Sequence, residues 1–93
     1  MPSLSWHPDA IDDVARLYDF LVPVSPSVAK QAASIIKEAA DRIAVNPYLG
    51  LPRAEFREWF APFGRSVYVL RYHILPSGDV LITRVWHSRE LRP

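Results

Sequence analysis

The sequence predicts a single α+β domain in which a short strand and an antiparallel helical hairpin precede a three-stranded antiparallel meander. Three observations carry this prediction. A chain of 93 residues can bury one hydrophobic core but cannot divide it in two. Apolar residues recur at helical spacing through the first half of the chain. From residue 56 onward the composition becomes aromatic and β-branched, with proline and glycine between the segments.

The composition limits the classes of function. With 49% hydrophobic and 23% charged residues, the chain has ample apolar material for a packed core. The lack of cysteine excludes a disulfide framework, a thiolate zinc site and a cysteine nucleophile, and it fits a reducing compartment, so we expect a cytoplasmic protein. No stretch has the length of a membrane span, and no signal peptide is recognisable. A formal charge of +1 predicts no strong sequence-independent attraction to nucleic acid.

The first elements are a short strand and a helix. Residues 3–7 alternate polar and apolar side chains, which is typical of a strand with Leu4 and Trp6 on one side. A helix is expected after Pro8, because Asp9, Asp12 and Asp13 suit the positive end of a helix dipole. Its expected apolar stripe is Ile11, Val14, Ala15, Tyr18, Leu21 and Val22.

A second helix is expected from Pro26 to about Val45. Ser25 followed by Pro26 suits the N-cap and the first helical position. Asn46 ends the helix, since a residue before proline is driven out of the α region. The short connection between the helices predicts an antiparallel hairpin. The second helix is expected to carry the i,i+4 pairs Lys37–Asp41 and Glu38–Arg42 and the apolar stripe Val28, Ala32, Ile35, Ile36, Ala39 and Ile43.

Three strands are expected in the second half of the chain, at residues 56–61, 65–75 and 80–87. A turn at residues 77–78 would pair the last two strands antiparallel and would leave one face nearly all apolar, which we expect to pack on the helices. The pairs are then Leu75 with Val80, His73 with Ile82, Arg71 with Arg84 and Val69 with Trp86. The expected helix-facing set is Tyr68, Leu70, Tyr72, Ile74, Leu81, Thr83, Val85 and His87.

This register places Arg71 opposite Arg84 on the open face of the sheet. Two like charges directly opposed weaken a sheet unless an anion lies between them. Glu58 on the neighbouring strand is one candidate, and a phosphate or an acidic partner is the other. Alternatively, both arginines extend into solvent as ordinary surface residues.

Other chemical patterns are weaker. No glycine-rich phosphate loop is present, and the histidines at 7, 73 and 87 lack metal-ligand spacing, so we expect neither a cofactor nor a metal. His87 stands beside Ser88, Arg89 and Glu90, where an imidazole could act as an acid or base or could simply cap the end of the strand. Aromatic residues near Arg57 and Arg65 could stack nucleobases or pack in the core.

Four segments resemble the RelE/ParE superfamily of toxins from type II toxin–antitoxin modules. They are residues 6–10 (WHPDA), 46–50 (NPYLG), 68–72 (YVLRY) and 85–90 (VWHSRE), and the resemblance spans nearly the whole chain. It implies a small bacterial toxin held inactive by a cognate antitoxin, whose C-terminal segment wraps the helical hairpin and the sheet. It also implies that the complex represses its own operon and binds operator DNA only through the antitoxin. The assembly would be a homodimer or a toxin–antitoxin hetero-oligomer.

The superfamily contains two kinds of toxin. RelE-like members cut mRNA on the ribosome, whereas ParE-like members poison DNA gyrase. The chain departs from the RelE pattern in its low net charge and in Val69, where RelE-like members typically have arginine after the first tyrosine. The resemblance therefore favours a gyrase inhibitor that is not an enzyme. The alternatives are a metal-independent endoribonuclease using His87, Arg65, Arg71 and Arg84, and a non-toxic partner in a repressor complex.

Two sets of contact residues follow as hypotheses. The basic sheet face and the charged C-terminal segment suggest a target-contact group of Arg71, Arg84, Arg89 and Arg92. Antitoxin docking should use apolar residues that the helices and sheet leave uncovered. The residues expected there are Leu17, Phe20 and Trp59.

Overall fold

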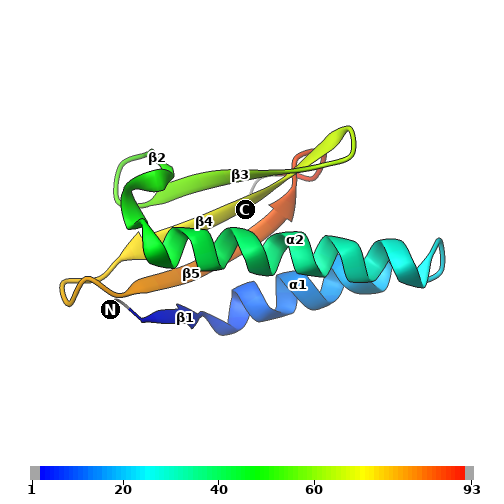
Figure 1. The fold of residues 1–93 in the computed structure, drawn as a ribbon, viewed down its shortest axis with the longest axis horizontal. Coiled ribbons are helices and arrows are strands. Elements are labelled where there is room, and N and C mark those ends of the chain that lie inside the picture. Colours follow the sequence, from blue (N-terminus) through cyan, green and yellow to red (C-terminus); the bar gives the residue numbers. More distant parts are fainter. Residues whose placement is uncertain (1–2, 92–93) are drawn as a thin grey trace.

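The computed structural model describes residues 3–91 and confirms the predicted α+β class. The expected strand, helical hairpin and meander are all present, with boundaries close to those predicted (Figure 1). A short 3-10 turn and a two-residue strand between the hairpin and the meander were not expected. The elements are β1 (Leu4–Trp6), α1 (Pro8–Leu21), α2 (Pro26–Val45), η1 (Pro47–Leu49), β2 (Leu51–Pro52), β3 (Arg57–Phe63), β4 (Ser66–Ile74) and β5 (Val80–His87).

Side-chain caps start both helices. The Nδ1 atom of His7 accepts the N–H of Asp9 at 3.0 Å, and the Oγ atom of Ser25 accepts the N–H of Val28 at 3.2 Å. Each cap is followed by a proline at the start of its helix. The predicted cap at Ser25 is thus confirmed. Within residues 3–91, neither helix combines the length and the apolar character needed to cross a membrane.

The five strands form one sheet in the order β1-β5-β4-β3-β2. β1 runs parallel to β5, while the other neighbours are antiparallel. The parallel pair needs a crossover connection, and the helical hairpin lies within it. Both helices cover the same face of the sheet and leave the opposite face without a helix (Figure 1).

The register of the last hairpin was predicted in part. Arg71 pairs with Arg84, as expected, and Val69 pairs with Trp86. The pairs expected for His73 and Leu75 are wrong, because Thr83 is an extra residue at a β-bulge and Tyr72 pairs directly with Ile82. The bulge exchanges the faces of β5 beyond it, so that Val80 and Ile82 enter the core in place of the predicted Leu81 and Thr83.

The core fills the space between the hairpin and the sheet. α2 contributes most of its predicted stripe, whereas α1 is rotated from the prediction: Ala10, Asp13 and Leu17 are buried, while Ile11 is exposed. The physical reason is that Asp13 has two partners on β5, so this carboxylate faces the sheet. The buried cluster comprises Ala10, Leu17, Ala32, Ile36, Ala39, Ala40, Ile43, Ala61, Tyr68, Leu70, Tyr72, Val80, Ile82 and Val85.

A buried tyrosine fixes η1 and β2 against the meander. The hydroxyl of Tyr72 accepts the N–H of Gly50 at 2.8 Å and donates to the carbonyl of Pro47 at 2.6 Å. A Cβ atom at position 50 would lie 2.5 Å from this hydroxyl, so only glycine allows the close approach. This contact holds β2 where it pairs with the start of β3.

Candidate functional site

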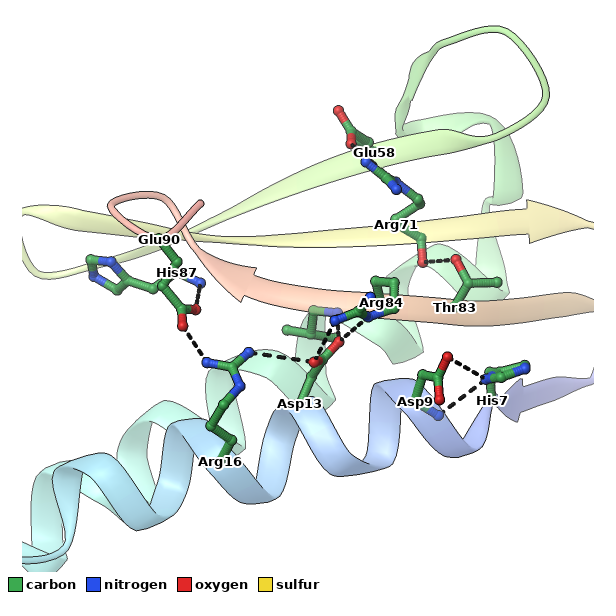
Figure 2. A network of polar contacts seen from close by, with 11 residues as sticks. His7, Asp9, Asp13, Arg16, Glu58, Arg71, Thr83, Arg84, His87 and Glu90 are labelled. Carbon is green, nitrogen blue, oxygen red and sulfur yellow. Dashed lines mark hydrogen bonds and ion pairs between the residues drawn. The ribbon is translucent and has the colours of Figure 1, made fainter. Parts of the chain in front are cut away.

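Arg84 on β5 is held by a carboxylate from α1. Its Nε lies 2.8 Å from Oδ2 of Asp13 and its Nη2 lies 3.1 Å from Oδ1, which makes the pair bidentate (Figure 2). The same Oδ2 accepts the N–H of Val85 at 2.8 Å. Asp13 is only 4% exposed. It therefore satisfies both a guanidinium and a backbone donor of β5, beyond the point where β1 stops pairing with that strand.

Arg16 extends this network to the segment after β5. Its Nη2 lies 3.4 Å from Oδ1 of Asp13, and its Nη1 donates to Oε2 of Glu90. The other oxygen of Glu90 accepts the N–H of His87 at 2.8 Å (Figure 2). The residues that follow β5 are thus tied to α1 through a single arginine.

Arg71 belongs to a second cluster, on the sheet face opposite the helices. Glu58, which is 1% exposed, accepts from Arg71 Nη2 at 3.3 Å and from Arg53 Nε at 3.0 Å. The guanidinium of Arg71 also lies over two rings, 4.3 Å from the centroid of Phe56 and 5.0 Å from that of Trp86. One carboxylate and two aromatic rings therefore fix Arg71 in place.

These two clusters explain how Arg71 and Arg84 can lie opposite each other, because each guanidinium has its own carboxylate partner. Glu58 partners Arg71, as one of the alternatives proposed, while Arg84 turns to Asp13 instead. Sequence reasoning assigned Asp13 to the helix dipole and missed this role. The available signal was its spacing, since Asp13 falls between Ala10 and Leu17 on one helical face.

Of the nuclease candidates, Arg71 and Arg84 are not brought to His87. Its ring meets Tyr68 edge-on at 5.5 Å, its Nδ1 accepts the N–H of Arg89 at 3.1 Å, and its imidazole points away from Arg84 (Figure 2). Arg65 is exposed in the β3–β4 turn, and Arg71 is held by its own carboxylate. In the target-contact set, Arg89 is exposed, whereas Arg92 lies outside the described residues.

The three apolar residues expected to contact the antitoxin lie in different environments. Leu17 is buried in the core, so the expectation that it is uncovered is wrong; the rotation of α1 by Asp13 turns it inward. Phe20 is 76% exposed on α1. Trp59 is half-buried on β3 with the guanidinium of Arg42 5.6 Å from its ring.

An apolar groove runs between the two helices. Its volume is about 560 Å³, and its lining includes an exposed isoleucine, Ile11. We name it the hairpin groove. The residues that line it are Trp6, Ile11, Val14, Ala15, Tyr18, Asp19, Ala33, Ile36 and Lys37.

The electrostatics of Asp13 follow from its partners. Burial by itself would raise the pKa of Asp13, but the hydrogen bonds from Arg84 and from the Val85 N–H outweigh burial and lower it. The same hydrogen bond raises the pKa of Arg84. Burial, with a smaller effect of Glu90, raises the pKa of Tyr68. Across residues 3–91, no group of three or more His, Cys, Asp or Glu side chains is placed to hold a metal ion.

Comparisons with known proteins identify the relatives of this chain. A family model described as the ParE toxin of the type II toxin–antitoxin system parDE matches residues 4–92. A Caulobacter vibrioides protein named Toxin RelE1 is 37% identical over 81 residues, which is 86% of each chain. Toxin RelE2 of the same organism is 33% identical over 92 residues, or 98% of this chain and all of the relative.

A solved structure has the same fold. It is titled the chromosomal ParDE toxin–antitoxin system from P. aeruginosa, with a TM-score of 0.72 and 23% identity, covering 91% of this chain and 94% of that chain. Together with the strand order and helical hairpin described above, these matches define a toxin of the RelE/ParE superfamily. Within it, the chain belongs to the ParE toxin family of type II toxin–antitoxin systems, and this membership implies a cognate antitoxin.

Proposed function

We propose that this toxin inhibits DNA gyrase, as the ParE resemblance implies, and that a cognate antitoxin neutralises it. The match of the ParE family model to residues 4–92 is the observation that carries the proposal. The fixed arginines add support, because Arg71 and Arg84 are each engaged by a buried carboxylate while the imidazole of His87 is directed elsewhere. RNA cleavage by a 2′-hydroxyl attack would need such groups to converge on one phosphate.

The test is a gyrase supercoiling and cleavage assay with the purified toxin, run beside an assay of mRNA cleavage on programmed ribosomes. Loss of supercoiling with trapped double-strand breaks, and intact message, is the expected result. Intact supercoiling with cleaved message would reverse the assignment. No effect in either assay would favour a non-toxic antitoxin-binding partner in a repressor complex.

The proposed target-contact group is Arg84 and Arg89, with Arg71 and Arg92 as further members. Arg84→Lys keeps a positive charge facing Asp13 but loses the planar fork. Combined with Arg89→Ala, it should raise the toxin dose needed for growth inhibition by about tenfold. Lys30→Ala, an exposed change on α2, serves as the matched control. Unchanged growth inhibition at equal protein levels would contradict this assignment.

The RelE-like alternative has one specific observation in its favour, which is the RelE name of the two curated relatives. In that case His87 would act through Nε2, since Nδ1 accepts the N–H of Arg89. His87→Gln should then abolish mRNA cleavage. Under the gyrase proposal, the same variant should leave supercoiling inhibition within about twofold of the wild type.

For antitoxin docking we propose the hairpin groove together with Phe20. An apolar groove between two helices suits the apolar face of an amphipathic helix, and the exposed aspartates of α1 suit basic residues on its polar face. Ile11→Glu should weaken antitoxin binding by at least about tenfold, and Phe20→Ala by less. Lys30→Ala, an exposed change on α2 outside the groove lining, is the control. Unchanged antitoxin affinity for both apolar variants would count against this site.

A further inference from the structure

The outer edge of β3 is open over most of its length. Among residues 3–91, β2 pairs only with Arg57 and Glu58, so β3 has no neighbouring strand on its outer side from Trp59 to Phe63. Phe56 accepts the N–H of Arg53 on the outer side, and Glu58 pairs with Leu51 there, so alternation directs the backbone groups of residues 60 and 62 outward as well. This edge offers the N–H and C=O of Phe60 and the C=O of Pro62.

Arginines and aromatic rings flank this open edge. Arg42 lies over the ring of Trp59, and Arg57 lies 5.1 Å from the ring centroid of Tyr48. Tyr48 is 70% exposed and Leu51 is 49% exposed, although both are large apolar side chains. We call this surface the β3 edge; it consists of Arg42, Tyr48, Leu51, Arg57, Trp59 and Phe60.

Its composition is that of a protein-binding site. Tyrosine, tryptophan and arginine dominate the residues that carry binding energy at protein interfaces. The rings are also prearranged, because Arg57 donates to the carbonyl of Gly50 at 2.6 Å while it covers Tyr48. A partner therefore meets side chains that lose little conformational freedom on binding.

The chemistry of the β3 edge selects one kind of occupant. Unpaired N–H and C=O groups of a strand are matched by another polypeptide strand, not by a nucleic acid. The guanidiniums of Arg42 and Arg57 favour carboxylates on that strand. A second copy of this chain would bring further guanidiniums to this edge instead of carboxylates, so charge complementarity disfavours self-pairing.

We propose that the β3 edge binds an extended acidic segment of the target protein, which adds a strand to β3. The inference rests on the proposed function and names a second contact surface for it, separate from Arg84 and Arg89. The antitoxin is assigned to the hairpin groove, whose lining includes none of the β3-edge residues.

The experiment measures binding of the purified toxin to immobilised DNA gyrase and, in parallel, to the cognate antitoxin. Arg42→Glu reverses an exposed charge and should weaken gyrase binding by at least about tenfold, with a smaller loss at high salt. Lys30→Glu makes the same change three turns earlier on α2 and should leave binding unchanged. Neither variant should alter antitoxin affinity.

A second pair of variants tests strand addition itself. Phe60→Pro removes the outward N–H, which makes no bond to β4, and proline is tolerated on edge strands. Phe60→Val removes the ring but keeps the N–H. The proline variant should bind gyrase at least about fivefold more weakly than the valine variant. Thermal unfolding establishes that each variant is folded.

The outcomes are distinct. Gyrase binding that is lost in Arg42→Glu and Phe60→Pro but kept in the controls supports the inference. Wild-type affinity in both edge variants overturns it and leaves the gyrase proposal intact. Loss of antitoxin affinity in place of gyrase affinity also overturns it. If the unmodified toxin does not bind gyrase at all, the proposed function fails and the inference fails with it.

Discussion

The two edges of the sheet are treated in opposite ways. On the β5 side, β1 pairs with Val80–Ile82, the N–H of His7 then donates to Ile82, and Asp13 accepts the N–H of Val85. On the other side, β2 covers only the first two residues of β3. Exposed strand edges tend to pair with other chains, so proteins usually cover or blunt them. Here the stretch of β5 beyond β1, which we call the sealed edge, is closed by a buried carboxylate, and the outer side of β3 is left open.

The difference separates structural charge from surface charge. Asp13 places the Arg84 guanidinium against the fold and closes an edge, whereas Arg42 and Arg57 at the β3 edge contact exposed or half-buried rings. An arginine that a buried carboxylate holds, as Asp13 holds Arg84, therefore serves the fold even where its exposed part is proposed to contact the target. The open backbone beside the ring contacts distinguishes the β3 edge.

The largest expected effect comes from opening the sealed edge. Asp13→Ala leaves the Arg84 guanidinium and the Val85 N–H without their acceptor, and it should lower the free energy of unfolding by about 3–5 kcal/mol. Urea denaturation followed by circular dichroism measures this change. Asp13→Asn keeps a carbonyl acceptor and should lower the free energy of unfolding clearly less. Equal losses in both variants would show that the charge, rather than the edge contact, is what matters.

A smaller loss of stability is expected when the contact that anchors β2 is removed. Tyr72→Phe removes the hydroxyl that joins the Gly50 N–H to the Pro47 carbonyl, at a cost of about 1–3 kcal/mol. Hydrogen exchange should report faster exchange at Gly50 and in β2. The matched variant Tyr48→Phe removes an exposed hydroxyl and should change stability by less than about 0.5 kcal/mol. Unchanged protection of Gly50 would contradict the anchoring role.

Both edges illustrate how far sequence reasoning reaches. The cap at Ser25 was predictable, because it depends on a local spacing. The pairing of Arg71 with Arg84 was also predicted correctly, but only because the bulge at Thr83 offsets a one-residue error in the predicted pairing next to the turn. The bulge itself was not predictable, since alternation of side chains does not encode an extra residue. The role of Asp13 was also missed, because its partners lie 71 and 72 residues away in the chain. The misplacement of Leu17 followed from that omission.

The sealed edge should also depend on pH. The pKa of Asp13 is held below its ordinary value of 3.8 in the folded chain, chiefly by Arg84 and the Val85 N–H acting against burial. A lowered folded pKa stabilises the fold fully above the unfolded value, and this stability is lost as pH falls below about 3.8 through the folded pKa. The free energy of unfolding, measured by urea denaturation at pH 5 and at successively lower pH, should therefore fall more steeply for the wild type than for Asp13→Asn. Parallel curves would contradict this linkage.

The smallest effect on stability, and the sharpest test of the open edge, is expected from Pro62. Its ring removes the outward N–H that a longer pairing would need, which limits the β3 edge to the groups of Phe60 and one further carbonyl. Pro62→Val should change the free energy of unfolding by less than about 1 kcal/mol. It restores a donor, so concentration-dependent self-association should appear in sedimentation experiments, chiefly at high salt, where the guanidiniums are screened. Pro76→Val, in the β4–β5 turn, should show no such gain in self-association under the same conditions. Association of both variants alike would mean that the β3 edge is not responsible.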